Sequence, residues 1–207
     1  MSCSDNPLVG GLDLQANREL AYLNLYNNRL DRIDLSQNPK LWYLVISGNR
    51  LGELNLSAQS ALTHLVVSGN ELENLDIGRN QDLRTLDVSD NHIDGWSLKG
   101  CSNLWYLYAS LNRLSELDLA ANTNLMILDL TGNRLETLNL SRNPKLQRLY
   151  VGNNNLTSLD LSRNELLEKI FAVGNPIREL YFGSNLLLEL KEMDLSDCSL
   201  PLSALLK

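Results

Sequence analysis

The chain has 207 residues, enough for one large domain with a buried core or for two small ones. Its 25 acidic residues outnumber its 18 basic residues, and the net charge of −7 argues against a partner bound through the phosphates of DNA or RNA. No apolar run approaches the roughly 18 residues of a membrane span, so we expect no transmembrane segment.

The chain opens with MSCSDNP, which has neither the basic nor the apolar segment of a signal peptide. Cys3 begins the run CSDN, which would suit the start of a bacterial lipoprotein that had lost its leader. An ordinary free cysteine near a terminus is the interpretation that we favour. Cys101 and Cys198 lie far away with no CxxC or Cys/His spacing, so we expect neither a disulfide framework nor a zinc site.

From residue 7 onward the sequence repeats with a period of 21 residues, and we interpret 1–207 as a single repeat domain. A half coil at 7–19 comes first, and a last coil at 190–200, after a step of 23 residues, precedes a short end at 201–207. The coils between them follow the frame LxxLxLxxNxL and begin at residues 20, 41, 62, 83, 104, 125, 146 and 167.

Each coil is expected to place the leucines of its LxL motif inward and the residues between them outward. Successive coils would stack at roughly 4.8 Å and pair their backbones in a parallel sheet. The returning arm reads LDLS, LNLS or LDIG, which alternates with period two and leaves no room for a two-turn helix. We therefore expect short strands or extended turns there, and little α-helix.

Two columns of polar residues recur at the bends. An inward asparagine carries both donors and acceptors for turn backbone groups that would otherwise be buried unpaired. The first column is a predicted structural asparagine ladder of Asn28, Asn49, Asn70, Asn91, Asn112, Asn133, Asn154 and Asn175. The second column is Asn17, Asn38, Gln59, Asn80, Cys101, Asn122, Asn143, Asn164 and Asn185. Cys101 and Cys198 take places in these columns, so we interpret them as small inward residues and not as a reactive or ligating pair.

This pattern resembles the leucine-rich repeat family over essentially the whole chain, and its 21-residue period is similar to that of bacterial, internalin-like members. The resemblance implies a curved, right-handed solenoid, or horseshoe, with the LxxLxL segments forming a parallel sheet on the concave face. It also implies a bacterial protein at the cell surface or secreted. The half coil at the start, the 23-residue last step and the short end depart from the family pattern, so we expect the family's usual cap modules to be reduced or missing. We expect a monomer.

Catalysis has little support in the sequence. His64 and His92 each fall on a repeat position that other coils fill with ordinary surface residues, and no nucleophile–base pair stands out from the repeat. We therefore expect no enzyme activity and no cofactor.

A row of carboxylates on the returning arm raises the question of a metal. Calcium prefers clustered oxygen ligands, but this column has no closely spaced acids within one coil. A solvated acidic stripe without a metal is the reading that we favour over a calcium site. The column contains Asp13, Asp34, Asp76, Asp118 and Asp160, interleaved with Asn55, Ser97 and Asn139.

The aromatic residues are unevenly distributed, because nine of the twelve fall on outward positions of the predicted concave sheet. Strand preference alone would also favour aromatic residues, but the extended returning arm receives almost none of them. We expect these residues, with His64, Met126 and Ile127, to form a ligand-binding surface. The nine are Tyr22, Tyr26, Trp42, Tyr43, Trp105, Tyr106, Tyr108, Tyr150 and Phe171.

The predicted surface divides into two clusters, with His64 at the border of the first and with Arg84, Thr85 and Asp87 between them. The favoured function is a non-catalytic module that binds a protein or peptide partner. A carbohydrate-binding module is an alternative, since Trp and Tyr also stack on sugar rings. A second alternative is a structural spacer within a larger bacterial surface protein.

Overall fold

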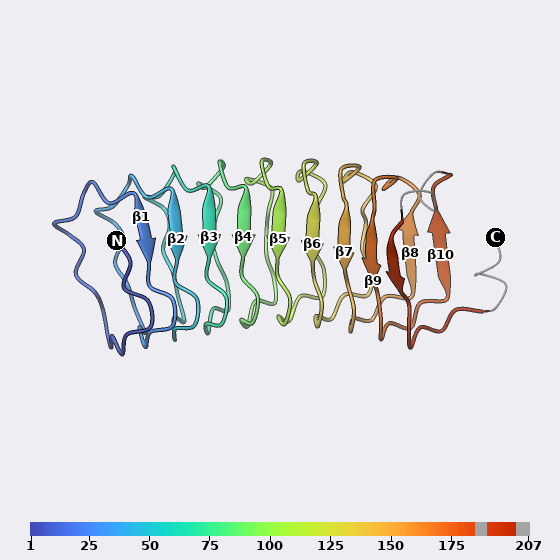
Figure 1. Cartoon of the computed structure of the whole chain (residues 1–207), viewed down its shortest axis with the longest axis horizontal. Helices are drawn as coiled ribbons and strands as arrows, with labels where there is room; N and C mark the ends of the chain where they lie inside the picture. The colour runs from blue at the N-terminus through green and yellow to red at the C-terminus, as the bar shows by residue number, and fades with distance from the viewer. Residues whose placement is uncertain (185–189, 202–207) are drawn as a thin grey trace.

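The computed structural model describes residues 1–184 and 190–201. Successive coils of the chain stand side by side along the long axis, with the N-terminus at one end (Figure 1). Within the described ranges the chain forms strands, bends and turns but no helix, and hence no helix that could cross a membrane. The predicted fold class, a leucine-rich solenoid with a parallel sheet and little helix, is confirmed.

One side of the solenoid is a parallel sheet to which each coil contributes a short strand. Its strand order is β1-β2-β3-β4-β5-β6-β7-β9-β11 in the described residues. The strands are β1 (Tyr22–Asn24), β2 (Tyr43–Val45), β3 (His64–Val66), β4 (Thr85–Asp87), β5 (Tyr106–Tyr108), β6 (Ile127–Asp129), β7 (Arg148–Tyr150), β9 (Lys169–Phe171) and β11 (Glu192–Asp194).

The 21-residue period fixes the register of this sheet. Leu44 of β2 pairs with Leu23 of β1 on one side and with Leu65 of β3 on the other, and all three are fully buried. Because side chains alternate across a strand, the residues on either side of each such leucine face solvent together. The pattern thus builds a leucine core and one continuous outer surface at once. At the last step the sequence distance between paired residues is longer than 21, since Glu192 of β11 pairs with Lys169 of β9.

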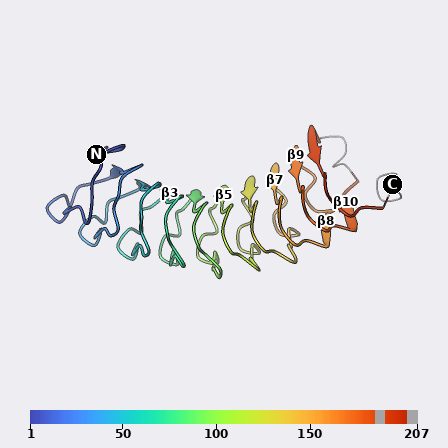
Figure 2. The same cartoon turned by 90° about the horizontal axis from the view of Figure 1, so that it is seen from below.

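The solenoid is a shallow arc, and the nine-stranded sheet lies on its inner side (Figure 2). An arc spaces its outer side more widely than its inner side, which favours a continuous backbone ladder on the inner side. On the outer side, β8 (Ser158–Leu161) and β10 (Glu179–Phe182) pair in parallel near the C-terminal end. The returning arms of the earlier coils are extended without a ladder.

The first polar column links each coil to the one before it. In Asn49, the side-chain nitrogen donates to the carbonyl oxygens of Ile46 and Leu25 at 2.9 and 3.0 Å. Its side-chain oxygen accepts from the backbone N–H of Leu30 at 3.0 Å. Asn70, in the next coil, repeats the arrangement with Val67, Ile46 and Leu51. Each amide therefore satisfies backbone groups of two coils in the interior.

The second polar column is bonded less completely. The side-chain nitrogen of Asn122, for example, donates to the carbonyl oxygens of Leu98 and Cys101. Among the described residues no partner faces the side-chain oxygens of six members, although all six residues are fully buried: Asn38, Gln59, Asn80, Asn122, Asn143 and Asn164. Cys101 is likewise fully buried in this column, and Cys198 is half-buried.

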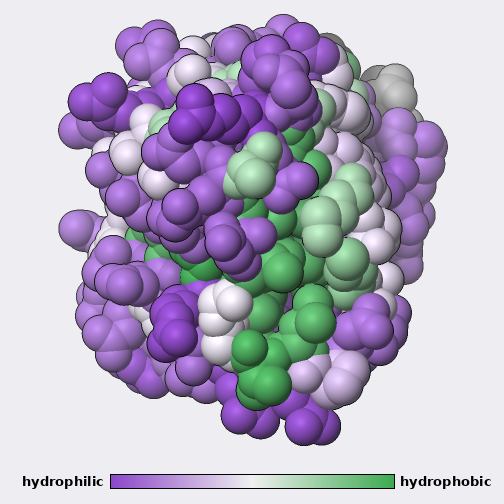
Figure 3. All heavy atoms as spheres, turned by 90° about the vertical axis from the view of Figure 1, so that its left-hand side faces the viewer, coloured by the Kyte–Doolittle hydropathy of each residue, from purple (hydrophilic) through white to green (hydrophobic). Residues whose placement is uncertain are grey.

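The N-terminal end covers its apolar side chains incompletely. An apolar band reaches the surface when the molecule is seen from that end (Figure 3). In the half coil Val9 is 73% exposed, and Leu8 and Leu12 are half-buried. At the other end, residues 202–207 of the predicted end segment 201–207 and residues 185–189 of the coil that begins at 167, including Asn185, lie outside the described residues.

Candidate functional site

Three rows of side chains cross the solvent-facing side of the nine-stranded sheet, which we call the concave face. One row precedes the strands, one occupies their first positions and one their last positions. The row before the strands runs Trp42, Thr63, Arg84, Trp105 and Met126. The first strand positions are Tyr22, Tyr43, His64, Thr85, Tyr106, Ile127, Arg148 and Lys169, and the last are Asn24, Val45, Val66, Asp87, Tyr108, Asp129, Tyr150 and Phe171.

The first aromatic cluster comprises Tyr22, Trp42, Tyr43 and His64. Tyr22 and Tyr43 stack with ring centroids 4.7 Å apart and planes at 12°. Trp42 meets the rings of Tyr43 and His64 edge-on, at 5.6 and 6.1 Å. Tyr22 is 38% exposed and Trp42 is 45% exposed, so these mutually supported rings still present area to solvent. Tyr26, past the end of β1, is 48% exposed.

His64 is a full member of this cluster and not its border, because its ring also lies 5.5 Å from that of Tyr43. Its Nδ1 shares a 2.8 Å hydrogen bond with the hydroxyl of Thr63. Burial disfavours the charged imidazolium and, with the positive charge of Arg84, lowers the pKa of His64 below its ordinary value. The surroundings of His64 in the first aromatic cluster therefore favour its neutral imidazole.

Arg84 was predicted to separate the two aromatic clusters, but its side chain contacts the second of them. Its guanidinium lies 5.0 Å from the centre of the Trp105 ring, within the range of a cation–π contact. Trp105 is 39% exposed under it. The sequence places Arg84 on the concave face but gives no signal for the side-chain torsions that direct it toward Trp105.

The second aromatic cluster comprises Trp105, Tyr106, Tyr108, Tyr150 and Phe171. Tyr150 and Phe171 stack at 5.3 Å with planes at 14°. Burial raises the pKa of Tyr108, and the charge of Asp87 adds to the increase. Except for Trp105 these residues are half-buried, as are Met126 and Ile127 beside them. Eleven of the twelve predicted contact residues thus lie in the three rows of the concave face, and Tyr26 follows the end of β1.

Leu111 was missed by the sequence analysis. Its φ is 54°, in the left-handed region that a branched side chain rarely adopts, and its side chain is 58% exposed. Other coils place Asn27, Gly48, Gly69 or Asp90 at the same repeat position, also with positive φ. This departure from the repeat, an apolar residue in a Gly/Asn/Asp column, is visible in the sequence.

The charged end of the concave face is internally paired. Lys169 contacts Glu192 at 2.6 Å, and Lys191 contacts Glu168 at 2.9 Å, each pair joining neighbouring coils. These four side chains offer little uncompensated charge to a partner.

The carboxylates of the acidic column on the convex side accept hydrogen bonds from the backbone of their own turns. Asp34 accepts from the N–H of Ser36 at 2.9 Å, and Asp118 and Asp160 accept in the same way from the residues two positions on. The backbone N–H and the hydroxyl of Ser36 bond to the charged form of Asp34 and lower its pKa, and the hydroxyl of Ser162, with its N–H, lowers the pKa of Asp160. Across the described ranges, no three His, Cys, Asp or Glu side chains gather where they could hold a metal ion.

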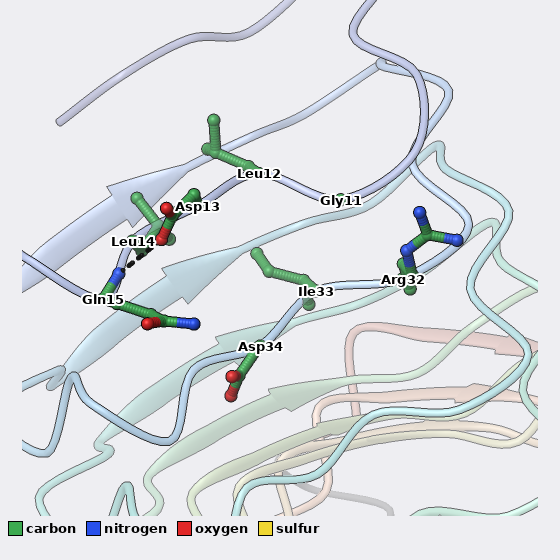
Figure 4. A pocket seen from close by; sticks show the side chains of 8 residues that line it. All are labelled: Gly11, Leu12, Asp13, Leu14, Gln15, Arg32, Ile33 and Asp34. Carbon is green, nitrogen blue, oxygen red and sulfur yellow. Dashed lines mark hydrogen bonds between the residues drawn. The ribbon is translucent and has the colours of Figure 1, made fainter.

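The convex side also carries shallow hollows between arms. One of about 370 Å³ is lined by Leu12, Asp13, Arg32, Ile33 and Asp34, among others. Figure 4 shows the Asp13 carboxylate turned back toward its own chain, where it accepts from the N–H of Gln15 at 3.0 Å. An acid engaged in its own turn is poorly placed for ligand or acid–base work.

The cysteines do not suggest chemistry either. Burial raises the pKa of the Cys101 thiol to about 11, which keeps it protonated and unreactive at neutral pH. Cys3, Cys101 and Cys198 are all free thiols.

The repeat is recognised in known proteins. The family model described as Leucine Rich repeat matches residues 79–95, 121–137 and 152–167. The functional domain of InlJ from Listeria monocytogenes, which includes a cysteine ladder, superposes with a TM-score of 0.90 at 29% identity over 95% of this chain. The chain is a leucine-rich repeat protein. Its similarity to InlJ supports the predicted internalin-like type of repeat.

Other solved leucine-rich repeat structures are also similar. The plant peptide hormone receptor RGFR1 in complex with RGF2 gives a TM-score of 0.85 at 28% identity over 97% of this chain. YopM, a leucine-rich effector protein from Yersinia pestis, gives 0.77 at 26% identity over 88%. This leucine-rich repeat chain spans 43%, 36% and 51% of the InlJ, RGFR1 and YopM chains. No curated protein matches it by sequence. Leucine-rich repeat solenoids are commonly protein-interaction modules and typically non-catalytic.

Proposed function

We propose that this leucine-rich repeat protein is a non-catalytic binding module that recognises a protein or peptide through the aromatic residues of its concave face. The observation that carries the proposal is the exposure of Tyr22, Trp42 and Trp105 on the concave face, 38–45% each, with Tyr26 just past β1 at 48%. A cluster of exposed Trp and Tyr is the composition of a binding hot spot, because these rings bury a large area and lose little side-chain entropy.

The form of the surface supports the same proposal. The rings of the first aromatic cluster hold one another in stacked and edge-on contacts, and Arg84 covers part of Trp105. Rings that are already ordered cost less free energy to immobilise when a partner binds. The similar receptor RGFR1 was solved in complex with RGF2, which favours a peptide or protein as the partner class.

A bacterial setting, at the cell surface or secreted, is part of the proposal. It follows from the internalin-like repeat type and from the similarity to the Listeria InlJ domain.

A pull-down from a bacterial extract, with the protein as bait, tests the proposal. A partner should be captured by the wild type and lost with the double variant Tyr106→Ala/Tyr108→Ala. A bait carrying Asp118→Asn and Asp160→Asn on the convex side is the matched control, because Asn55 and Asn139 already fill that column and accept the same turn bond. Loss in the control with retention in the tyrosine variant would refute the proposal.

Carbohydrate is the rival ligand class, since the same rings could stack on sugars. A glycan panel tests it directly. Glycan binding that Trp42→Ala and Trp105→Ala abolish, with no protein partner captured, would replace our proposal by the carbohydrate one.

A further inference from the structure

Two carboxylates flank one tyrosine on the concave face. In the sheet register, Tyr108 of β5 pairs with Asp87 of β4 on one side and with Asp129 of β6 on the other. Neighbouring strands lie about 4.8 Å apart, so the two acids stand on either side of the phenol ring. All three side chains are half-buried.

Neither carboxylate has a counter-charge among the residues that the structure describes. Each uses one oxygen to accept a backbone N–H, Asp87 from Ser89 at 2.9 Å and Asp129 from Thr131 at 3.0 Å. Within residues 1–184 and 190–201, neither makes an ion pair or a second hydrogen bond. A half-buried carboxylate that lacks a cation leaves much of its electrostatic interaction unused.

The other charged side chains of the concave face are mostly held in contacts of their own. The acids at its far end are paired with lysines, and Arg84 lies on Trp105. Arg148 of β7 is the cation that acts on Tyr108, since its charge works against the rise in the pKa of that hydroxyl. It lies two strands away in a different row, whereas Asp87 and Asp129 lie on the strands directly beside Tyr108 and in its own row.

We propose that Asp87, Tyr108 and Asp129 form a subsite for a basic side chain, arginine or lysine, of the peptide or protein bound on the concave face. The cation would lie on the phenol ring, where a cation–π contact adds to the attraction of two carboxylates. This inference deepens the proposed function and rests on it.

The neighbouring surfaces indicate which groups of the bound segment lie over which strands. Over β1–β3, where the first aromatic cluster lies with Val45 and Val66 beside it, the three rows hold no carboxylate, whereas Asp87 and Asp129 lie beside Tyr108. A partner that matches this face carries uncharged apolar or aromatic groups over β1–β3 and a basic group over β5.

The test begins with a random peptide library displayed on phage and selected on the wild-type protein. Clones that also bind the Tyr106→Ala/Tyr108→Ala variant are discarded, which leaves peptides that need the concave face. These peptides are expected to carry an arginine or lysine. Each is then synthesised with that residue and again with uncharged citrulline or norleucine in its place, and the uncharged version is expected to bind about tenfold more weakly.

Protein variants locate the cation. Asp87→Asn and Asp129→Asn should each weaken the basic peptide about tenfold and leave its uncharged version unchanged. Asn24 occupies the same row and accepts the N–H of Tyr26 at 3.0 Å, so the asparagine variants retain the turn bond. Arg148→Gln should strengthen the basic peptide by about threefold, since it removes a repelling charge. Asp118→Asn, on the convex side, is the control.

The outcomes are distinguishable. If peptides need the concave face but lack a basic residue, or bind both aspartate variants with wild-type affinity, the subsite is wrong and the proposed function stands. If no peptide or protein depends on this face, the proposed function fails and the subsite fails with it.

Discussion

The side-chain nitrogen of Asn112 donates a 3.0 Å hydrogen bond to the carbonyl oxygen of Val88, 24 residues earlier in the chain. It also donates to Ala109 of its own coil, and its side-chain oxygen accepts from the N–H of Ile93 at 3.0 Å. One buried amide therefore ties together the bends of two coils, and the same arrangement recurs along the first polar column.

Asn112→Ala should lower the free energy of unfolding by roughly 1–3 kcal/mol, because it leaves those buried backbone groups unpaired. Urea unfolding measures the change. Asn17→Ala is the matched control, since Asn17 is exposed in the half coil, and it should cost clearly less. Equal losses would show that the amide column does not hold the stack.

Leu107 and its neighbours separate core from surface within a single strand. Leu107→Ala should destabilise by roughly 2–5 kcal/mol, because Leu107 is fully buried between coils. Tyr106→Ala and Tyr108→Ala, on the opposite side of the strand, should each cost much less. Thermal unfolding followed by circular dichroism compares the three. Tyrosine variants as unstable as Leu107→Ala would place the rings in the core and remove the proposed surface.

Leu111 is strained, and relieving the strain should stabilise the protein. A left-handed conformation costs a branched L-residue roughly 1–2 kcal/mol, and asparagine tolerates it better. Asn27 and Asn153 already hold this conformation in other coils. We therefore expect Leu111→Asn to raise stability by about 1 kcal/mol in urea unfolding.

A substitution at the same repeat position of the next coil checks that a side chain is strained there. Gly132 has a φ of 70°, and a Cβ there would approach Leu111 Cδ2 to 2.9 Å, so Gly132→Ala should destabilise. A neutral effect of Gly132→Ala, or a loss of stability in Leu111→Asn, would contradict the strain.

The pKa of His64 should be measurably below 6.5, its ordinary value, in an NMR titration. Arg84→Gln should raise it only in part, because burial is the larger cause. Between 6.5 and the lower folded value the unfolded chain binds more protons, so this histidine makes stability fall as the pH drops through that window. His64→Gln should remove that component. A titration at or above 6.5 would refute the burial of the imidazole in the first aromatic cluster.

The sequence predicts the fold because the repeat itself encodes it. Leu23, Leu44 and Leu65 recur at one position, and a constant spacing forces residues 21 apart into register. It does not predict the β8–β10 ladder, which depends on how closely the outer arms approach at one end of the arc.

The sequence predicts which side chains of the sheet face outward, but not the contacts that they make. Outward positions such as Tyr43 follow from period-two alternation in the strand. The cation–π contact of Arg84 on Trp105 and the inclusion of His64 in the first aromatic cluster depend on side-chain torsions, which the repeat does not specify. The unpaired state of Asp87 and Asp129 is visible only when every neighbouring cation has been placed.

Isothermal titration calorimetry with the captured partner tests the central claim, binding through the concave aromatic face, most directly. The account predicts that Tyr106→Ala and Tyr108→Ala each weaken binding by about 2 kcal/mol or more, as hot-spot residues do, while Asp118→Asn and Asp160→Asn leave it unchanged. Wild-type affinity in both tyrosine variants, together with weakened binding in the convex-side variants, would contradict it.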